Sequence, residues 1–591
     1  MLPKNGVLLL VLCLLGAALT AQQVLLVATP GSDEERAITA GARAALSALG
    51  LDASVAASAG IDALASAQAH PEARLVICAA PRARVQALAA AAAKRGVVVC
   101  DVGRNGLGGA LDPSPEEEGA DAAWWLCGPF AHHDVLVLQG SERTDKEEAA
   151  AFVARAKSLH ALKRVEGPVG VESAAALKKR LQRAAEDGIT AVFCAAAPHE
   201  VQAVAATAQE ITPRLVVLAS SRALSVVEKP AAFSEGLVVM DFAPPTLAIA
   251  KELPAVAALA RQPGLDALRQ LAAFDALVSV FGAGVVKSVE SGGALRPGVS
   301  LRSRGSDPRR LLHAPVWLEA GAWKPMFPFD DTRPAPVQEG YDPARGFGAL
   351  SRWSTLQFVP RAGTTAAVFH FGDKDKRTIE DDLLRLKLST GGRLPLVDHL
   401  VREKLMARVL SVTAEKFLHE TDGAQVPGRS FAISVCARKP AKMPTKRIWP
   451  CAVAGDDPAA GGRAYGSYCE IYSSFIRRTI FEQRDLLERP VDALDLGTLT
   501  GIREESGPYV TGTRRDVLYR LIEGFAGSMG LTAAHEIGHL AGLGHDEDDP
   551  CGLMNVKEGA GISHNDGHFT PTNEAALEKT LGRVPNATPK R

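Results

Sequence analysis

The feature that most constrains this chain is the stretch 532–555, which reads TAAHEIGHLAGLGHDEDDPCGLMN. His535 and His539 are four positions apart, so on an α-helix they project from the same face one turn apart. That geometry brings two imidazole nitrogens to one metal ion, at about 2 Å each. Glu536 points about 100° away around the helix, where its carboxylate can face a metal-bound water without being a ligand. The spacing therefore predicts a metal-binding helix with a general base beside its ligands.

The residues after this helix predict a third ligand. Gly542 ends the helix, because a residue without Cβ adopts the left-handed conformation that turns the chain back. His545 then supplies a third nitrogen and leaves the fourth tetrahedral position to water, which is the arrangement of a catalytic Zn²⁺. We therefore predict that His535, His539 and His545 bind zinc and that Glu536 is the catalytic general base.

The run HEIGHLAGLGHD matches the extended pattern HExxHxxGxxH, and the Cys-Gly-Leu-Met sequence at 551–554 resembles the Met-turn that follows it in the metzincin metallopeptidases. The resemblance implies that the three histidines bind zinc and that Glu536 polarises the water. It also implies that Met554 lies beneath the metal as a hydrophobic floor.

The metzincin subfamily stays open between adamalysin-like, matrixin-like and archaemetzincin-like groups. Asp546, directly after the third histidine, resembles the adamalysins, whereas the spacing of Cys551 and Met554 resembles the archaemetzincins. Astacins and serralysins carry a tyrosine two residues beyond the methionine, where this chain has Val556. A tyrosine that supports the oxyanion is therefore not expected at that position.

Two other interpretations of the motif exist. Histidines four apart on a helix also form surface ladders or buried pairs, but Gly542, His545 and Met554 argue against that interpretation. A zinc site that has lost its activity is the second, and the retention of Glu536 argues against it.

The first 21 residues have the pattern of a secretory signal peptide. Lys4 precedes an apolar run from Val7 to Leu15, and small residues end the segment at Ala21. The run is short for a bilayer span, so we expect cleavage after Ala21 and an exported protein, secreted or periplasmic. A retained membrane anchor is the alternative. No second long apolar segment follows, so we expect no stable membrane insertion after cleavage.

Charge and cysteine content bound the partners and the compartment. The chain has 66 Lys and Arg against 67 Asp and Glu, a balance that does not suggest nucleic acid as a partner.

Three cysteines end apolar strand-like runs and fit buried thiols as well as bridges: Cys78, Cys100 and Cys194. In an exported protein we expect at least one disulfide among the later four, which lie among loop residues: Cys436, Cys451, Cys469 and Cys551.

Between residues 22 and 329, short Val- and Leu-rich runs alternate with Ala-rich amphipathic stretches. VLLVATP is followed by 33–49 and RLVICAAP by 82–95, and a second set includes ITAVFCAAAP and RLVVLAS. This βαβ rhythm predicts parallel sheets in two lobes. The order resembles the type 1 periplasmic binding proteins, particularly the branched-chain amino-acid receptor group, including a late helix FDALVSVFGAGVVKSVESGG and a returning strand APVWLEAGAWKP.

That resemblance implies a ligand crevice at the carboxyl ends of the strands. Ala79-Ala80-Pro81-Arg82 stands where those receptors have a Ser or Thr that grips an amino acid, so amino-acid binding is not expected. We expect a recognition domain for a small-molecule or peptide ligand instead. The pairs Trp124-Trp125 and His132-His133 near the lobe crossover either touch that ligand or are packing or surface residues.

Residues 330–363 shift to Pro, Gly and Arg without periodicity and are the predicted linker. The predicted metallopeptidase domain covers 364–591. It contains a strand in TTAAVFHFG, a helix over 395–420, strands in SFAISVC and SYCEIYSSFI, the zinc helix over 515–541 and a C-terminal helix capped by Thr570. The predicted fold class is α/β: a two-lobed periplasmic-binding-like region with parallel sheets, then an α+β metzincin-like domain.

Two smaller groups allow more than one interpretation. His564 and His568 are four apart, so they either bind a second metal or line the substrate cleft. The acidic residues 547–549 either hold calcium or form a solvated turn.

The sequence thus predicts an exported zinc endopeptidase that cleaves a protein or peptide substrate, with an N-terminal recognition domain. The alternative, from a different class, is a solute-binding or scaffold protein whose zinc domain is catalytically silent. Glu536 beside an open fourth coordination position is the feature that separates the two.

Overall fold

The computed structural model contains two compact units. The N-terminal unit comprises 1–125, 134–158 and 164–339, and the C-terminal unit comprises 126–133, 159–163 and 340–591. The segment Leu126–His133 therefore belongs to the C-terminal unit, although the sequence analysis placed it in the domain 22–329.

The structure describes the following residues: 24–28, 30–48, 56–59, 73, 75–78, 87–88, 90–92, 94, 97–101, 115–159, 164–171, 173–211, 214–221, 223, 237–242, 313–319, 322–325, 355, 358–372, 379–421, 423–437, 447–453, 455–457, 459–481, 487–500, 512–546, 552–555 and 567–586. The predicted signal peptide, the expected helix FDALVSVFGAGVVKSVESGG and most of the predicted linker lie outside them.

The N-terminal unit begins with a four-stranded parallel sheet in the order β2-β1-β3-β4. Its elements are β1 (Val24–Val27), α2 (Asp33–Ala48), β2 (Ala56–Ala59), β3 (Leu75–Cys78) and β4 (Val98–Asp101). Every residue of β1 and β3 is buried, as expected for apolar strands covered on both faces. The predicted parallel pairing of this region is confirmed.

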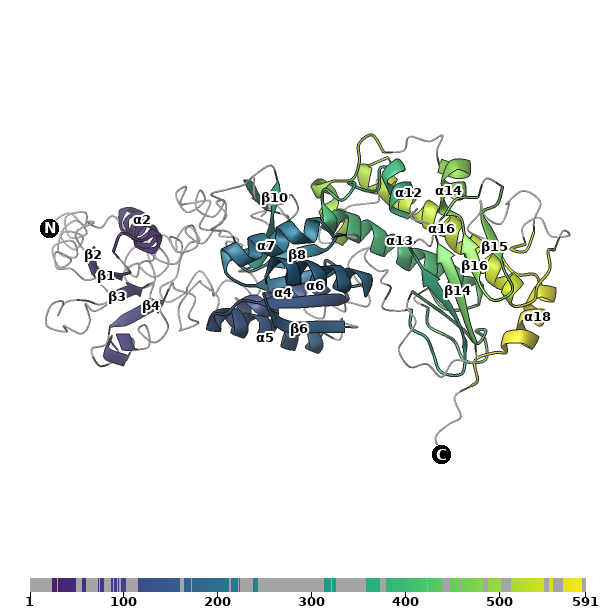
Figure 1. Ribbon diagram of the computed structural model, residues 1–591, viewed down its shortest axis with the longest axis horizontal. Coiled ribbons are helices and arrows are strands. Elements are labelled where there is room, and N and C mark those ends of the chain that lie inside the picture. The colour runs from purple at the N-terminus through teal and green to yellow at the C-terminus, as the bar shows by residue number, and fades with distance from the viewer. Residues whose placement is uncertain are drawn as a thin grey trace, which may run out of the picture. The chain divides into compact units, whose positions relative to one another are not determined.

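A seven-stranded sheet follows in the order β11-β10-β9-β8-β7-β5-β6. Three of its strands, β6, β8 and β10, are labelled in Figure 1. Five strands run parallel, namely β5 (Asp134–Gln139), β6 (Arg164–Gly170), β7 (Ala191–Ala195), β8 (Val216–Ala219) and β9 (Val238–Phe242). The returning strand is an antiparallel hairpin at one edge, β10 (His313–Glu319) and β11 (Ala322–Pro325). The helices of this region are α4 (Pro115–Cys127), α5 (Arg143–Ser158), α6 (Ala174–Glu186) and α7 (Pro198–Gln209). Apolar residues of α6, α7, β7 and β8 form one buried cluster, so the predicted second α/β set is confirmed.

The C-terminal unit has a five-stranded sheet in the order β13-β12-β14-β16-β15. Its strands are β12 (Thr365–His370), β13 (Ile433–Cys436), β14 (Arg447–Val453), β15 (Gly462–Ala464) and β16 (Cys469–Ile471). The first four in this order pair in parallel, and β15 pairs antiparallel with β16 at the edge. The strands predicted in TTAAVFHFG and SFAISVC are confirmed.

The strand predicted in SYCEIYSSFI is shorter than expected. It ends at Ile471, and Ser473–Ile476 form helix α14, followed by η9 (Arg477–Phe481). The hydroxyls of Ser473 and Ser474 donate to the buried Asp382 at 2.7 and 3.0 Å, and this local bonding favours a helical turn over a strand.

Two long helices, α13 (Pro395–Lys416) and α16 (Arg514–Leu540), confirm the helices predicted over 395–420 and 515–541. The shorter ones are α12 (Ile379–Arg385), η10 (Ala493–Asp495), α15 (Leu496–Thr500) and α18 (Pro571–Leu581). Thr570 caps α18 as predicted, because its hydroxyl accepts from the Asn573 amide at 3.3 Å.

Helices α13 and α16 approach closely at a glycine. A Cβ built on Gly530 would lie 2.7 Å from Val412 Cβ and 2.9 Å from the Val409 carbonyl oxygen. Thr413 donates to the Gly530 carbonyl at 3.2 Å, and Arg408 pairs with Glu523 at 2.6 Å. Helix α13 therefore holds the backbone of the helix that carries the predicted site.

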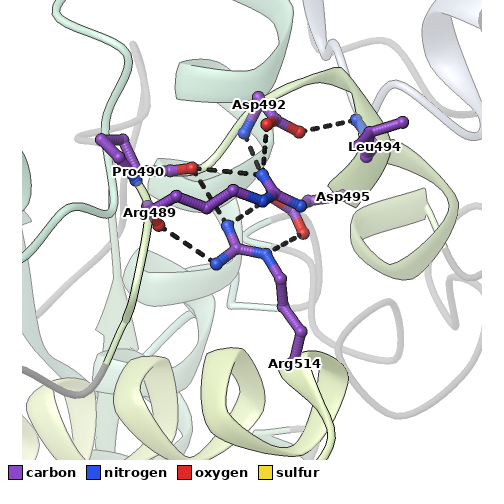
Figure 2. A network of polar contacts seen from close by, with 6 residues as sticks. All are labelled: Arg489, Pro490, Asp492, Leu494, Asp495 and Arg514. Carbon is purple, nitrogen blue, oxygen red and sulfur yellow. Dashed lines mark hydrogen bonds and ion pairs between the residues drawn. The ribbon is translucent and has the colours of Figure 1, made fainter.

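The start of α16 is anchored by an arginine network (Figure 2). Arg514 donates from Nε and Nη2 to the two oxygens of Asp495, at 2.8 Å each. Its remaining donors bind the carbonyls of Arg489 and Pro490 at 3.1 and 3.0 Å. A planar guanidinium fork gives such contacts direction as well as energy, so the network sets where α16 begins.

The cysteines correct one prediction. The six cysteines whose side chains the structure describes are buried thiols, and no disulfide joins any two of these six. Cys436, Cys451 and Cys469 lie on β13, β14 and β16, whereas the sequence analysis placed them among loop residues. Cys451 pairs in register with Cys469 on neighbouring parallel strands, so the two side chains project from the sheet side by side. Cys551, the fourth of that group, lies outside the described residues.

Across the parts of the chain that the structure describes, no helix combines the length and the apolar character that crossing a membrane requires.

Candidate metal centre

Helix α16 carries the first two predicted ligands and ends directly after them. Gly542 has a φ of 93°, a conformation that a residue with Cβ rarely adopts. The Leu543 amide donates to the Gly538 carbonyl at 3.0 Å, which closes the end of the helix. The chain then reverses and brings His545 back toward the helix, so the predicted role of Gly542 is confirmed.

The three predicted histidines converge at this helix end. His539 Nε2 lies 3.1 Å from His535 Nε2 and 3.0 Å from His545 Nε2. The ring of His539 meets the other two nearly at right angles, with interplanar angles of 88° and 80°. Bonds of about 2.05 Å to a tetrahedral ion would place such nitrogens about 3.3 Å apart, so the spacing fits one ion. Within the described ranges, this is the one group of three side chains that could hold a metal.

The outer ring nitrogens set the tautomer of two of these histidines. His535 Nδ1 lies 2.6 Å from the Leu553 carbonyl oxygen, and His539 Nδ1 lies 2.9 Å from that of Leu543. A carbonyl oxygen only accepts, so each Nδ1 carries a hydrogen, and the neutral form of each ring has its lone pair at Nε2. Burial lowers the pKa of His535 to about 4, so its ring is neutral at pH 7.

Two nitrogen lone pairs 3.1 Å apart repel each other, and a cation between them turns that repulsion into attraction. Neutral imidazoles with the opposite nitrogen bonded to a carbonyl are the usual zinc ligands. The donor set therefore fits Zn²⁺. Sequence reasoning did not identify the carbonyls of Leu543 and Leu553, because a backbone acceptor leaves no mark on residue type.

Glu536 is the next residue along the helix after the first ligand and is 6% exposed. Its carboxylate is not a member of the three-residue ligand group. Burial raises the pKa of Glu536 to about 7. The carboxyl thus lies in a dry environment that disfavours its charge.

The edge strand β15 covers this carboxylate. A Cβ on Gly462 would lie 2.8 Å from Glu536 Oε1 and 2.8 Å from Thr532 Cγ2, so only glycine lets the strand come this close. Gly462 is a site residue that the sequence analysis did not identify. Its signal was the glycine pair in the run AAGGRAYG, since glycine within a strand marks close approach of another group.

Met554 is fully buried and packs against the turn of α16 between the two ligands. A Cβ on Gly538 would lie 2.7 Å from Met554 Sδ. The Asp546 amide donates to the Met554 carbonyl at 3.0 Å, so the residue after the third histidine holds this turn in place. The structure thus brings Met554 to the ligand-bearing turn.

The start of α18 supports the same turn. Thr570 donates to Asp546 at 3.1 Å, and the Leu553 amide donates to the His568 carbonyl at 2.6 Å. His568 contributes its backbone to this contact and its side chain is exposed. His564 and the acidic residues 547–549 lie outside the described residues.

The aromatic and histidine pairs expected near a ligand crevice are buried instead. Trp124 and Trp125 pack edge to face at 5.1 Å, and both are less than 10% exposed. His132 and His133 are 0% and 5% exposed and contact side chains of α13. All four side chains are packing residues, one of the two interpretations that the sequence left open. The segment 79–82 lies outside the described residues.

No family model matches this chain, and no curated protein matches it. Solved structures are similar to it over about half of its length. An ABC transporter substrate-binding protein from Desulfitobacterium hafniense, in complex with Leu, is 16% identical, covers 51% of this chain and 99% of its own, and has a TM-score of 0.37. The leucine-binding protein LivK from Thermotoga maritima is 15% identical, covers 51% and 96%, and has a TM-score of 0.37. The C-domain of LpoA from Haemophilus influenzae, a regulator of PBP1A, is 16% identical, covers 51% and 98%, and has a TM-score of 0.34.

At these identities and TM-scores the similarity carries no ligand or activity to this chain. The metzincin resemblance of the C-terminal unit stays a prediction.

Proposed function

We propose that this chain is an exported zinc endopeptidase that hydrolyses a peptide bond in a protein or peptide. The observation that carries the proposal is the convergence of three Nε2 atoms at 3.0 and 3.1 Å, two of them on rings whose Nδ1 is bonded to a carbonyl. Three ligands on one side leave the fourth tetrahedral position open to water, as in catalytic rather than structural zinc sites.

In this proposal His535, His539 and His545 hold the zinc. When bound, zinc lowers the pKa of a water molecule and polarises the scissile carbonyl. Glu536 takes the proton of the attacking water and delivers it to the leaving amine. Its buried position suits this exchange, because burial brings the pKa of the free carboxyl to about 7.

The edge strand supports a peptide as substrate. β15 forms one edge of the five-stranded sheet, and its residue Gly462 lies against Glu536. An extended peptide can add to such an edge through main-chain hydrogen bonds, which do not depend on its sequence. A peptide bound there would pass beside the general base.

The second candidate function is a binding or scaffold role in which the zinc site is catalytically silent. The observation in this chain that favours it is the burial of Glu536, which is 6% exposed beneath β15 and therefore poorly placed to meet a substrate. The proteins with similar folds, a leucine complex and a regulator of PBP1A among them, are also described as binding proteins or regulators. In both candidates the N-terminal unit is a recognition module for a small molecule or a protein, and the protein is exported.

One experiment separates the two functions. The full-length protein is purified, its zinc is measured by elemental analysis, and turnover is followed on a denatured protein and on a quenched fluorogenic peptide library. Glu536→Gln keeps the shape of the side chain and removes the base. Glu523→Gln, the same change on the same helix away from the triad, is the matched control.

For an endopeptidase we expect one zinc per chain in all three proteins and a loss of turnover of roughly 10²–10⁴-fold in Glu536→Gln only. Bound zinc without turnover in the wild type would establish the silent site. Wild-type protein that binds no zinc would sink both proposals.

A further inference from the structure

A second group of histidines lies in the C-terminal unit, on residues that the proposed function does not use. The segment Leu126–His133 folds into a tight turn, in which the Ala131 amide donates to the Gly128 carbonyl at 2.9 Å and the His132 amide to the Leu126 carbonyl at 3.0 Å. Ala131 has a φ of 53°, an uncommon value for a residue with a Cβ. This turn presents two consecutive histidines to helix α13.

The first of them stacks on a histidine of α13. The rings of His132 and His399 lie face to face, with centroids 3.8 Å apart and an interplanar angle of 16°. His399 Nε2 lies 3.2 Å from the Ala131 carbonyl oxygen, so this nitrogen donates to the turn. His132 is fully buried, and its ring can therefore not turn a charge toward water.

The second histidine binds a buried carboxylate one turn further along α13. His133 Nε2 lies 3.1 Å from Glu403 Oε1, which also accepts from the amide and hydroxyl of Thr355 at 2.9 and 2.8 Å. Burial alone would raise the pKa of Glu403, but the charge and hydrogen bond of His133 outweigh it and lower the pKa. The carboxylate is thus ionised and binds His133 through the Nε2 atom of its ring.

We propose that His132 and His399 form an acid-sensitive clasp, which holds the segment Leu126–His133 on α13 while both rings are neutral and releases it when either ring takes up a proton. The geometry is the reason. A face-to-face stack with centroids 3.8 Å apart accommodates two neutral imidazoles. Protonation of one ring would bury a charge, and protonation of both would also place two positive charges in contact.

The surrounding charges set the direction of the pH response. The charged groups that act on the pair are His133 of the segment, and Arg402 and Glu403 of α13. Burial, with repulsion from His399 and His133, holds the pKa of His132 well below its usual range. Burial also lowers the pKa of His399 to about 4, although Glu403 acts in the opposite sense.

A histidine in water titrates near pH 6.5. Between about pH 6.5 and pH 4 the released segment therefore binds more protons than the clasped one, so acid favours release. Above that range both forms carry neutral rings at these two positions and the clasp is at its strongest.

The test is backbone hydrogen exchange on the full-length protein at pH 7.5 and pH 5.0, with exchange times scaled for the intrinsic rate. For the peptides that cover 126–133 and 395–404, we expect the equilibrium constant for opening to increase tenfold or more at pH 5.0. Protonation of each released histidine can raise that constant up to about 30-fold at this pH. Peptides of β12 are the internal reference. In the same samples, exchange of the imidazole C2 hydrogens reports the titration of each histidine without any substitution.

Variants separate the clasp from general acid effects. His399→Phe keeps a flat ring and removes its proton site. The increase in opening of 126–133 between pH 7.5 and pH 5.0 should therefore fall to threefold or less. His419→Asn is the matched control. His419 is another buried histidine of this unit, and burial lowers its pKa to about 4. Its ring binds the Phe431 carbonyl and takes no part in the stack. His419→Asn and the triad variant His545→Ala should both keep the tenfold increase.

Three results would overturn the clasp. The first is equal protection of 126–133 at both pH values in the wild type. The second is titration of His132 and His399 near pH 6.5 while the segment stays protected, a result that needs no variant to fold. The third is a full increase in a folded His399→Phe protein. None of these outcomes depends on zinc or on peptide hydrolysis, so the clasp and the proposed function fail separately.

Discussion

Two groups of histidines in the C-terminal unit use the same ring in opposite ways. In the triad, His539 meets its neighbours at 88° and 80°, and the ring edges bring Nε2 atoms to 3.0 and 3.1 Å. In the clasp, His132 and His399 lie at 16° with their centroids 3.8 Å apart. The ring edges carry the lone pairs, so the triad can bind a cation at its centre, whereas two rings stacked 3.8 Å apart leave no room for one between them.

The comparison extends to the protonation of one ring in each group. Burial lowers the pKa of His535 and of His399 to about 4 in each case. In the triad a neutral ring is what a metal needs, and in the clasp it is what the stack needs. A proton therefore competes with the metal at one site and opens the contact at the other.

The largest effect is expected from His539→Ala, which removes the ring that lies between the other two. We expect zinc affinity to fall on the order of 10³-fold or more, because two imidazoles hold the ion far less tightly than three. Competition with a chelator of known affinity measures it. His399→Phe should keep wild-type zinc affinity, and equal loss in both variants would break the distinction between the two groups.

A second prediction concerns the contact between the helices that carry the two groups. Gly530→Ala places a methyl 2.7 Å from Val412 Cβ and 2.9 Å from a backbone oxygen that cannot move freely. We expect the C-terminal unit to lose about 3 kcal/mol of stability. Urea dependence of hydrogen exchange in α13 and α16 measures the loss.

Gly524→Ala on the same helix is the control, since its nearest neighbours are ring atoms of Phe481 at 3.3 and 3.4 Å. We expect it to stay within about 1 kcal/mol of the wild type, because relief of glycine's helix penalty offsets a small adjustment. If Gly530→Ala were equally mild, the close approach of the two helices would not be a requirement of the fold.

The third prediction is acid destabilisation of the zinc-free protein. Burial lowers the pKa of His399 and of His419 to about 4, and the unfolded chain titrates near 6.5. The contribution of these two histidines to stability should be flat above pH 6.5 and fall as pH drops toward 4, by roughly 2 kcal/mol for each histidine at pH 4.5. Glu536, whose pKa burial raises to about 7, acts in the opposite sense. Urea unfolding across this range measures the slope, which should be smaller in His419→Asn. A slope in His419→Asn equal to that of the wild type would contradict the lowered pKa of His419.

The smallest effect is expected at Met554, which packs against Gly538 between the first two histidines. Met554→Leu keeps nearly the same volume, so stability should change by less than about 1.5 kcal/mol and zinc should be retained. Gly538→Ala at the facing position should cost more, because its methyl meets Leu543 and Phe569 at 3.3 Å as well as Met554. Equal effects of the two substitutions would show that the packing at this turn is looser than the distances indicate.

Particular elements show how far prediction from the sequence reaches. The zinc helix expected over 515–541 is Arg514–Leu540, because helical periodicity and an N-cap are properties of neighbouring residues. The strand expected in SYCEIYSSFI stops at Ile471, because Ser473 and Ser474 bind Asp382, which is more than 90 residues earlier. Three of the four cysteines expected in loops, Cys436, Cys451 and Cys469, lie on strands for a similar reason, since short strands such as β16 are defined by their neighbours in the sheet.

The sequence by itself determined the triad. Four residues of helix, one glycine turn and three more residues suffice to bring His535, His539 and His545 together, because local backbone geometry sets every distance involved. Two features were decided only by the tertiary structure. One is the clasp, in which His133 and Glu403 meet across 270 residues, and the other is the packing of Gly462 against Glu536. Such contacts depend on which surfaces pack together, and that choice is made by the summed burial of many side chains that no local pattern records.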